Sequence, residues 1–411
     1  MTDTIQINGD RLWSSLMEMA KIGATDKGGV CRLALTDVDK AARDLFVKWC
    51  EQAGCTVTID RMGNIFGRRE GKRADLPPVM TGSHIDSQPT GGKFDGIYGV
   101  LSGLEVIRTL NDAGIETDAP IEVSAWTNEE GSRFAPAMVS SGVFSGVFDL
   151  EYGLSRADLD GKTMGEELER IGYAGDAPVG KPVRAFFEVH IEQGPILENE
   201  SKTIGVVTDA QGQRWYEVTF TGQEAHAGPT PMATRRDALL GAARVIEAVN
   251  RIGLDHAPLA CATVGLVEVH PNSRNTIPGR VFFAVDLRHP NDETLSKMDA
   301  ALRVAVADVA QALNLETELN EIWYSPPVPF DADCVAAVRR AAEANGMAHR
   351  DIVSGAGHDA CYISRVAPTS MVFIPCEGGI SHNEIENATP EHVAAGCQVL
   401  LQAMLERAQA T

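Results

Sequence analysis

The stretch PVMTGSHIDSQPTGGKFDG, residues 78–96, sets a short apolar segment directly before a run of polar residues. Pro78–Gly82 is expected to form a strand, and His84, Asp86 and Asp95 follow it. The glycines around Asp95 allow the backbone to turn sharply or to approach a ligand closely. A histidine with an acid two residues later suits a metal site. Taken alone, the same spacing is also typical of a solvated polar loop.

Two further apolar segments end in the same way. Ile121–Trp126 precedes the acidic pair Glu129 and Glu130, and Ala185–His190 precedes IEQG. Helical patterns lie between the predicted strands, for example over Gly96–Leu110. Strands that alternate with helices indicate βαβ units and a mainly parallel sheet. Ligands bind beyond the carboxyl ends of the strands of such sheets, where these polar clusters are expected.

A different pattern occupies residues 211–325. Strands are expected at 214–221, 261–269, 281–288 and 317–324, and helices at 235–252 and 292–313. The order β-α-β-β-α-β is that of a ferredoxin-like split βαβ domain. The sequence therefore predicts an α/β domain, residues 1–210 and 326–411, that is interrupted by a small α+β domain, residues 211–325.

The composition narrows the class of protein. The chain has 411 residues, with 36 Lys and Arg against 57 Asp and Glu, so its formal net charge is −21. Such a charge argues against binding to nucleic acid or to an anionic membrane. No apolar run approaches the ~18 residues of a membrane span, and the first residues show no export signal. The eight cysteines form no C-x-x-C pair, so they are interpreted as reduced thiols of a cytoplasmic protein.

Three imidazoles and two carboxylates at separate strand ends form a candidate ligand set: His84, Asp95, Glu130, His190 and His382. Nitrogen and oxygen donors without a thiolate suit two divalent ions that share one carboxylate. Two such ions polarise a carbonyl group and activate water. Glu129 would then be the general base that passes the proton of this water to a leaving nitrogen. An exposed acidic loop is the alternative for the Glu129 and Glu130 pair in isolation.

Three other residues, His226, His358 and Arg288, are further candidates for the site. His226 lies between a strand end and a Gly-Pro turn, and His358, in SGAGHDA, is either a loop histidine or a residue close to a ligand. Arg288 ends an apolar strand. It forms either an ordinary salt bridge with Asp286 or Asp292, or a bidentate contact with a substrate carboxylate.

The exact amino-acid sequences of several segments carry further information: TGSHIDSQPTGGKFDGIYGVLSGLEVI, WTNEEGSRFAPAMVSSG, FEVHIEQGPILE, GQEAHAGPTPMATRRDAL, NSRNTIPG, VDLRHP, SGAGHDA and GGISHNEIE. Together they resemble the metal-dependent hydantoinase/carbamoylase family, which belongs to the aminoacylase/carboxypeptidase-type dinuclear zinc peptidase clan. The resemblance runs from about residue 10 to residue 405, with the motifs in order.

This resemblance implies a dinuclear zinc exopeptidase-like catalytic domain, interrupted by a ferredoxin-like lid and dimerisation domain. It makes the five candidate ligands metal ligands, with Asp95 bridging, Glu129 the catalytic base and Asp86 the carboxylate behind His84. His226 would stabilise the oxyanion, in the site of its own subunit or of the partner. The implied substrate contacts are Gln193, His226, Asn275, Arg288 and Gly357.

The activity implied first is hydrolysis of the carbamoyl C–N bond of N-carbamoyl-L-amino acids, which gives an L-amino acid, ammonia and carbon dioxide. Allantoate amidohydrolase and β-ureidopropionase are alternatives, and a dinuclear metallo-aminopeptidase or dipeptidase is a more distant one. Two divalent ions per subunit are expected, Zn²⁺ first and Mn²⁺, Co²⁺ or Ni²⁺ as alternatives. The expected partners are a small anionic ureido acid and a second copy of the chain, which would form a homodimer through the inserted domain.

Overall fold

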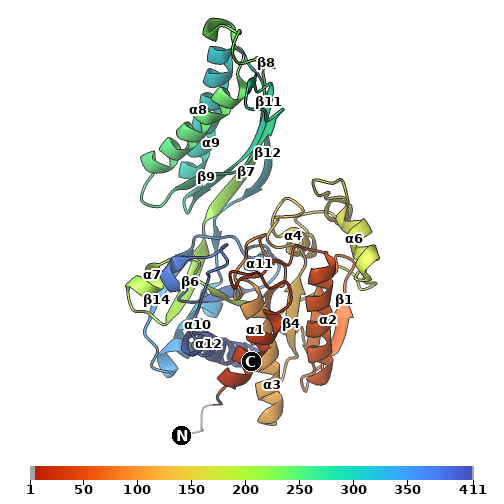
Figure 1. Cartoon of the computed structure of the whole chain (residues 1–411). Coiled ribbons are helices and arrows are strands. Elements are labelled where there is room, and N and C mark those ends of the chain that lie inside the picture. Colours follow the sequence, from red (N-terminus) through yellow and green to blue (C-terminus); the bar gives the residue numbers. More distant parts are fainter. Residues whose placement is uncertain (1–4, 410–411) are drawn as a thin grey trace. The chain divides into compact units, whose positions relative to one another are not determined.

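The computed structural model describes residues 5–409, and the chain divides into two compact units (Figure 1). Unit 1 consists of Met1–Asp209 and Pro329–Thr411, and unit 2 is the insertion Ala210–Val328. The boundaries expected from the sequence, after residues 210 and 325, lie close to these positions. No helix within residues 5–409 is long and apolar enough to cross a membrane.

Unit 1 is built on a nine-stranded sheet with the order β1-β2-β4-β3-β5-β15-β6-β13, in which β14 pairs with β6. The central strands β4, β3, β5 and β15 are parallel, whereas β2 runs antiparallel to β1 and β4, and β6 runs antiparallel to β15. The strands are β1 (Thr56–Ile59), β2 (Ile65–Arg69), β3 (Val79–His84), β4 (Ile121–Trp126), β5 (Ala185–Ile191), β6 (Ile204–Ala210), β13 (Val328–Pro329), β14 (His349–Ser354) and β15 (Thr369–Ile374).

The sheet of unit 1 is therefore mixed, and the prediction of a mainly parallel sheet holds only for its centre. The short connection between β1 and β2 permits only an antiparallel pair, because parallel strands need a long crossover. Every residue of β3, β4, β5 and β15 is buried. Helix α3 (Ile97–Asp112) packs on β3, and helix α12 (Pro390–Ala408) packs on β5 and β15. Complete burial explains why these strands appear in the sequence as short apolar runs.

The remaining helices of unit 1 surround this sheet. Thr36 begins α2, and Thr389 begins α12, because each threonine hydroxyl accepts a backbone N–H of the first turn, as N-cap residues do. The helices are α1 (Gly9–Met19), α2 (Asp37–Gln52), α4 (Val139–Phe144), α5 (Leu150–Leu154), α6 (Met164–Ile171), α7 (Ile196–Asn199), α10 (Ala332–Ala344) and α11 (Asp359–Ile363), with a 3₁₀ turn η2 (Glu377–Gly379).

Unit 2 contains a four-stranded antiparallel sheet with the order β12-β7-β11-β9. Numbered along the unit, this is the order 4-1-3-2, and the helices fall where the ferredoxin-like pattern predicts them. A small pair, β8 and β10, and a 3₁₀ turn complete the unit. The elements are β7 (Gly212–Thr221), β8 (Ala225–His226), η1 (Met232–Thr234), α8 (Ala238–Asp255), β9 (Cys261–His270), β10 (Thr276–Ile277), β11 (Arg280–His289), α9 (Asp292–Leu313) and β12 (Glu316–Ser325).

Unit 2 has its own hydrophobic core. The core consists of one face of the sheet, with Val218 and Phe283 among its residues, and of the apolar faces of α8 and α9, with Val245 and Leu302. Residues of β7 and β11 alternate between buried and partly exposed, as expected for an antiparallel sheet with one covered face.

Candidate active site

The carboxyl ends of the parallel strands of unit 1 bring the predicted ligands together. The register of the sheet pairs His84, at the end of β3, with Trp126, at the end of β4, and pairs His190 on β5 with Phe373 on β15. The segments that follow β4 and β15 therefore start at the same edge as the two histidines. These segments carry Glu129, Glu130 and His382.

Asp95 lies at the centre of the cluster. Its Oδ1 is 3.1 Å from His190 Nε2 and 3.7 Å from His84 Nε2, and its Oδ2 is 3.4 Å from His382 Nε2. His382 Nε2 is also 3.3 Å from Glu130 Oε2. The donors form two groups, His84–Asp95–His190 and Asp95–Glu130–His382, within each of which all donor atoms lie within 4.8 Å of one another. Because both groups contain Asp95, this arrangement fits two divalent ions that share one carboxylate.

The imidazole tautomers also fit metal binding. His84 Nδ1 lies 2.9 Å from the carbonyl oxygen of Asp86, and His190 Nδ1 lies 2.9 Å from that of Ile191. A carbonyl oxygen only accepts, so each Nδ1 must carry the proton. The Nε2 lone pair of both rings then faces Asp95, as a ligating histidine requires.

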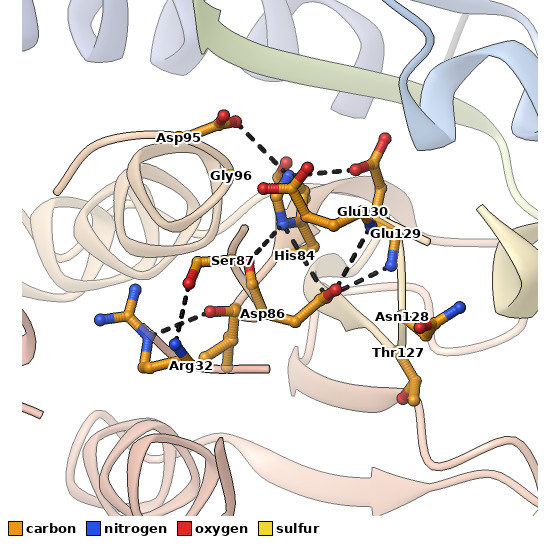
Figure 2. A network of polar contacts seen from close by, with 12 residues as sticks. Arg32, His84, Asp86, Ser87, Asp95, Gly96, Thr127, Asn128, Glu129 and Glu130 are labelled. Atoms are coloured by element: carbon orange, nitrogen blue, oxygen red, sulfur yellow. Dashed lines mark hydrogen bonds and ion pairs between the residues drawn. The ribbon is translucent and has the colours of Figure 1, made fainter. Parts of the chain in front are cut away.

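Asp86 contacts His84 through its main chain more closely than through its carboxylate. Its main-chain carbonyl accepts from His84, whereas its carboxylate oxygens stay 3.9 Å or more from His84 Nδ1. The carboxylate accepts the backbone N–H groups of Glu129 and Glu130 instead, at 3.2 and 3.3 Å (Figure 2). Asp86 thus fixes the backbone of the acidic pair, because its side chain satisfies two buried donors there.

Glu129 lies beside the cluster, with Oε2 3.4 Å from His84 Nε2 (Figure 2). Burial, and the neighbouring acids Asp359 and Glu130, hold the pKa of the Glu129 carboxyl well above its usual value. Burial and Asp95 raise the pKa of Glu130 to about 8. Burial opposes the charge of Asp95 as well, yet its contacts with His190 and His84 keep its pKa well below the usual value. Cations in the two groups would offset this crowding of buried acids.

The predicted substrate contacts fall in both units. Gln193, in unit 1, has a left-handed backbone (φ 58°) and donates from Nε2 to Asp95 Oδ2 at 3.0 Å. Its Oε1 is buried and has no hydrogen-bond partner among the described residues, so this oxygen remains available to a ligand donor. Gly357 precedes His358, whose ring centroid is 4.6 Å from that of His190. Both residues therefore lie at or next to the cluster.

His226, Asn275 and Arg288 all belong to unit 2. His226 on β8 pairs with Thr276 on β10, and the carbonyl of Asn275 accepts the N–H of Ala227 at 2.8 Å. These contacts bring His226 and Asn275 together. The Arg288 guanidinium forms a two-pronged contact with Asp286, with N–O distances of 2.7 and 2.9 Å. The salt bridge with Asp286 that the sequence allowed is thus present.

His358 is a loop residue that directly precedes helix α11. Its side chain is buried, and its Nε2 lies 3.1 Å from Ser354 Oγ. It forms a third group of possible ligands with Glu188 and His190. Glu188, which the sequence analysis did not select, accepts the Ser83 hydroxyl and the N–H of Ala360. Its position in the middle of the apolar strand β5 was the available signal, because a carboxylate there must be buried.

Glu386 is the clearest residue that sequence reasoning missed. Its carboxylate is 1% exposed and accepts the backbone N–H groups of Phe94 and Asp95, both at 3.0 Å. The Ser381 hydroxyl donates to the same carboxylate at 2.7 Å. Glu386 therefore connects the Asp95 loop to the segment that carries His382. A Cβ on Gly92 would lie 2.1 Å from the Glu386 carboxyl carbon, so only glycine fits there.

Known proteins are similar to this chain over most of its length. The family described as peptidase family M20/M25/M40 matches residues 80–406. The N-carbamoyl-L-amino-acid amidohydrolase of Rhizobium meliloti is 52% identical over 405 residues, which cover 98% of this chain and 97% of that protein. The ureidoglycolate hydrolase of Arabidopsis thaliana is 32% identical over 412 residues, which cover 97% and 87%.

A solved structure is similar to the whole chain as well. The crystal structure of an amidase of the hydantoinase/carbamoylase family from Burkholderia vietnamiensis is 72% identical, with a TM-score of 0.99 and full coverage of both chains. These similarities confirm the α/β fold class and the family resemblance that the sequence predicted.

Proposed function

From the premise that the chain belongs to peptidase family M20/M25/M40, we propose that it hydrolyses the carbamoyl C–N bond of N-carbamoyl-L-amino acids. The chain is an enzyme, a hydrolase that acts on non-peptide C–N bonds. The observation that carries the proposal is the pair of three-residue donor groups that share Asp95, with Glu129 beside them. The choice of substrate is supported by the name of the relative that is 52% identical over nearly the whole chain.

The residues that would hold the two ions are His84, Asp95 and His190 for one and Asp95, Glu130 and His382 for the other. When bound, two divalent ions polarise the ureido carbonyl and make water a better nucleophile. Zn²⁺ is the first choice, and Mn²⁺, Co²⁺ and Ni²⁺ also suit these nitrogen and oxygen donors.

Glu129 supplies the proton transfer. Its carboxylate takes a proton from the attacking water and delivers it to the departing amino-acid nitrogen, as a general base that then acts as a general acid. The products are the L-amino acid and carbamate, and carbamate decomposes to ammonia and carbon dioxide.

The substrate contacts complete the proposal. Gln193 Oε1 accepts a ureido N–H, and Arg288 binds the substrate carboxylate through its planar fork of donors. Asn275 and the backbone of Gly357 contribute further hydrogen bonds, and His226 stabilises the developing oxyanion. Unit 2 would act as a lid that brings His226, Asn275 and Arg288 to the substrate.

An ammonia-release assay on metal-loaded protein tests the substrate. The panel contains N-carbamoyl-L-amino acids, their D-enantiomers, allantoate, ureidoglycolate, N-carbamoyl-β-alanine and a dipeptide, and metal-free protein is the blank. We expect ammonia from the N-carbamoyl-L-amino acids only. Release from ureidoglycolate alone would select the activity named for the plant relative, and release from allantoate or N-carbamoyl-β-alanine alone would select those activities. Cleavage of the dipeptide alone would indicate a peptidase.

We further propose a homodimer formed through unit 2. Strand β9 is an edge of the four-stranded sheet, and Leu266 and Val267 on it are exposed. An exposed apolar edge strand is suited to pairing with a second chain. Sedimentation of the Val267→Lys variant should show a monomer, whereas Val304→Lys, at an exposed apolar residue of α9, should stay dimeric. A monomeric wild type would contradict the proposal.

Location of the protein in the cytoplasm stays a prediction.

Mixing two inactive variants tests where His226 acts. A heterodimer of Glu129→Gln and His226→Ala chains contains one site with both residues intact if His226 reaches the partner's site. Activity after mixing and refolding would indicate this arrangement. No recovery from a verified heterodimer would place His226 in the site of its own chain.

A further inference from the structure

Two thiols meet at the end of helix α2, away from the residues assigned to catalysis. Cys50 lies in the last turn of the helix and Cys55 lies directly before β1. Cys50 is completely buried and Cys55 is 8% exposed. Each thiol shifts the pKa of the other, so the two side chains lie close together. The eight cysteines were interpreted from the sequence as scattered, because this spacing is not C-x-x-C.

The backbone explains why the two side chains meet. The N–H of Cys55 donates to the carbonyl of Cys50 at 3.0 Å, and the N–H of Gly54 donates to the carbonyl of Glu51 at 2.9 Å. Gly54 has a left-handed backbone (φ 77°). Together these features form a Schellman motif, which places the side chain after the left-handed glycine against one in the last helical turn. The motif usually buries an apolar pair at these positions, and here both members are cysteines.

The surroundings of the pair favour a thiolate at Cys55. The hydrogen bond from the Cys50 thiol lowers the pKa of Cys55, and the guanidinium groups of Arg69 and Arg108 act in the same direction. Arg69 Nη1 is buried and has no hydrogen-bond partner among the described residues. Nearby positive charge of this kind is the usual environment of reactive cysteines. The pKa of Cys50 is raised instead, since it is the donor of the pair.

A cavity of about 550 Å³ lies beside the last turn of α2. It is lined by Trp49, Gln52 and Ala53, which flank Cys50 in the sequence, and by Arg108, but by neither cysteine. Cys55 is 8% exposed and Cys50 is completely buried, so we expect an oxidant to reach Cys55 first. A more exposed thiol beside a buried one is the pattern of a thiol and its resolving partner.

We propose that Cys50 and Cys55 form a reversible dithiol/disulfide site that reacts with small hydroperoxides. The Cys55 thiolate attacks the outer oxygen of the peroxide, the O–O bond breaks, and the leaving oxygen takes a proton and departs as an alcohol or water. Cys55 is then a sulfenic acid. The Cys50 sulfur attacks the Cys55 sulfur, the S–O bond breaks, and water leaves with the Cys50 proton. The two thiols are oxidised by two electrons in total, and the peroxide is reduced.

Peptide mass mapping of the folded full-length protein tests this site. Trypsin cleaves after Lys48 and Arg61, so both cysteines lie in one peptide, WCEQAGCTVTIDR. After treatment with hydrogen peroxide and alkylation, we expect this peptide to lose two hydrogen atoms and to resist alkylation at both cysteines. Dithiothreitol should restore both thiols. The Cys55→Ser variant should retain an alkylatable Cys50, whereas Cys261→Ser, at an exposed cysteine outside the pair, should oxidise like the wild type.

Three results would overturn the proposal. Both thiols of this peptide could stay alkylatable while Cys261 is oxidised, or Cys55 could gain oxygen atoms without losing the Cys50 thiol. The disulfide could also form as fast in guanidinium-unfolded protein as in folded protein, which would remove the role of the Schellman motif. Because the wild-type chain gives all three readouts, the test does not depend on whether a cysteine variant folds.

Discussion

The sheets of the two units are buried in different ways. In unit 1, β3, β4, β5 and β15 are buried along their whole length, whereas in unit 2 the residues of β7 and β11 alternate between buried and partly exposed. In a sheet covered on both faces, charged side chains gather where the strands end. In a sheet covered on one face they can stand on the open face, as Asp286 and Arg288 do on β11.

This difference implies that the two units have different roles in catalysis. The strand ends of unit 1 hold the candidate ligands and Glu129 in a buried setting that suits metal binding and a base of altered pKa, except for His382, which is half exposed. The open sheet face of unit 2 presents the Arg288 guanidinium, which is partly exposed and paired with Asp286. We therefore expect substitutions in unit 1 to affect the chemical step and substitutions in unit 2 to affect substrate binding.

The largest effect is expected for Glu129→Gln. The amide keeps the size of the side chain but removes the proton acceptor, so kcat should fall by about 10²–10⁴-fold. The metal content, measured by elemental analysis, should stay at the wild-type value because no ligand is changed. Loss of metal together with activity would mean that Glu129 is a ligand and not the base.

The separation of the two cores is tested by Phe283→Ala. Phe283 is fully buried in the core of unit 2, with its ring 5.8 Å from that of Phe220. Its truncation should lower the free energy of unfolding of unit 2 by about 3–5 kcal/mol. The affinity of unit 1 for metal, measured by titration in native conditions, should not change.

The matched variant is Phe187→Ala, in the buried strand β5 of unit 1. This variant should weaken metal binding as well as stability, because His190 lies on the same strand. Equal effects of both variants on metal affinity would show that the two units do not fold as separate cores.

Arg288→Ala should act mainly on binding. A charge-assisted contact contributes about 1.5–3 kcal/mol, so KM should rise by about tenfold to hundredfold with little change in kcat. Arg214→Ala is a control on the neighbouring strand of the same sheet, where Arg214 pairs with Glu321. A substrate whose carboxylate is replaced by an amide should not distinguish wild type from Arg288→Ala. An unchanged KM for the carboxylate substrate would leave Arg288 as a structural partner of Asp286 only.

The smallest effect is expected for Glu386→Gln. Both backbone N–H groups of the Asp95 loop donate to one oxygen, Oε1, so the amide oxygen can still accept them. The amide loses the negative charge and the second oxygen, which accepts the Ser381 hydroxyl, so metal affinity should fall by about tenfold. Isothermal titration with Zn²⁺ measures this change. Glu391→Gln, at an exposed acid in the first turn of α12, is the control and should bind metal like the wild type. Equal affinity of Glu386→Gln and wild type would mean that the loop positions Asp95 without help.

The sequence was sufficient for the centre of the fold and for the ligand set, for a physical reason. The apolar runs of β3, β4, β5 and β15 have no competing interpretation, and each polar cluster directly follows one of them in the chain. Proximity of the ligands then follows from parallel pairing alone. The edges of the sheet were less predictable. Strand β6 pairs with β15 and β14, which lie far away in the sequence, and no local sequence pattern predicts these pairings.

Glu386 was not predictable for the same reason. It is 292 residues from Phe94, whose N–H it accepts, and in the sequence it resembles any exposed acid. Gly92 was the complementary signal, but a glycine does not reveal which side chain fills the space it leaves. The burial of His358 was not predictable, because burial of a loop residue depends on which strand it packs against, here β5 through His190.

The left-handed backbone at the site has a consequence for protein engineering. Asn128, Gln193 and His382 have φ values of 58°, 58° and 53°, a conformation that costs an ordinary residue about 1–2 kcal/mol. A library screened for heat resistance would therefore enrich glycine at 193 and 382, and each gain in melting temperature would delete a side chain that contacts Asp95. These positions should be held fixed in any thermostabilisation campaign.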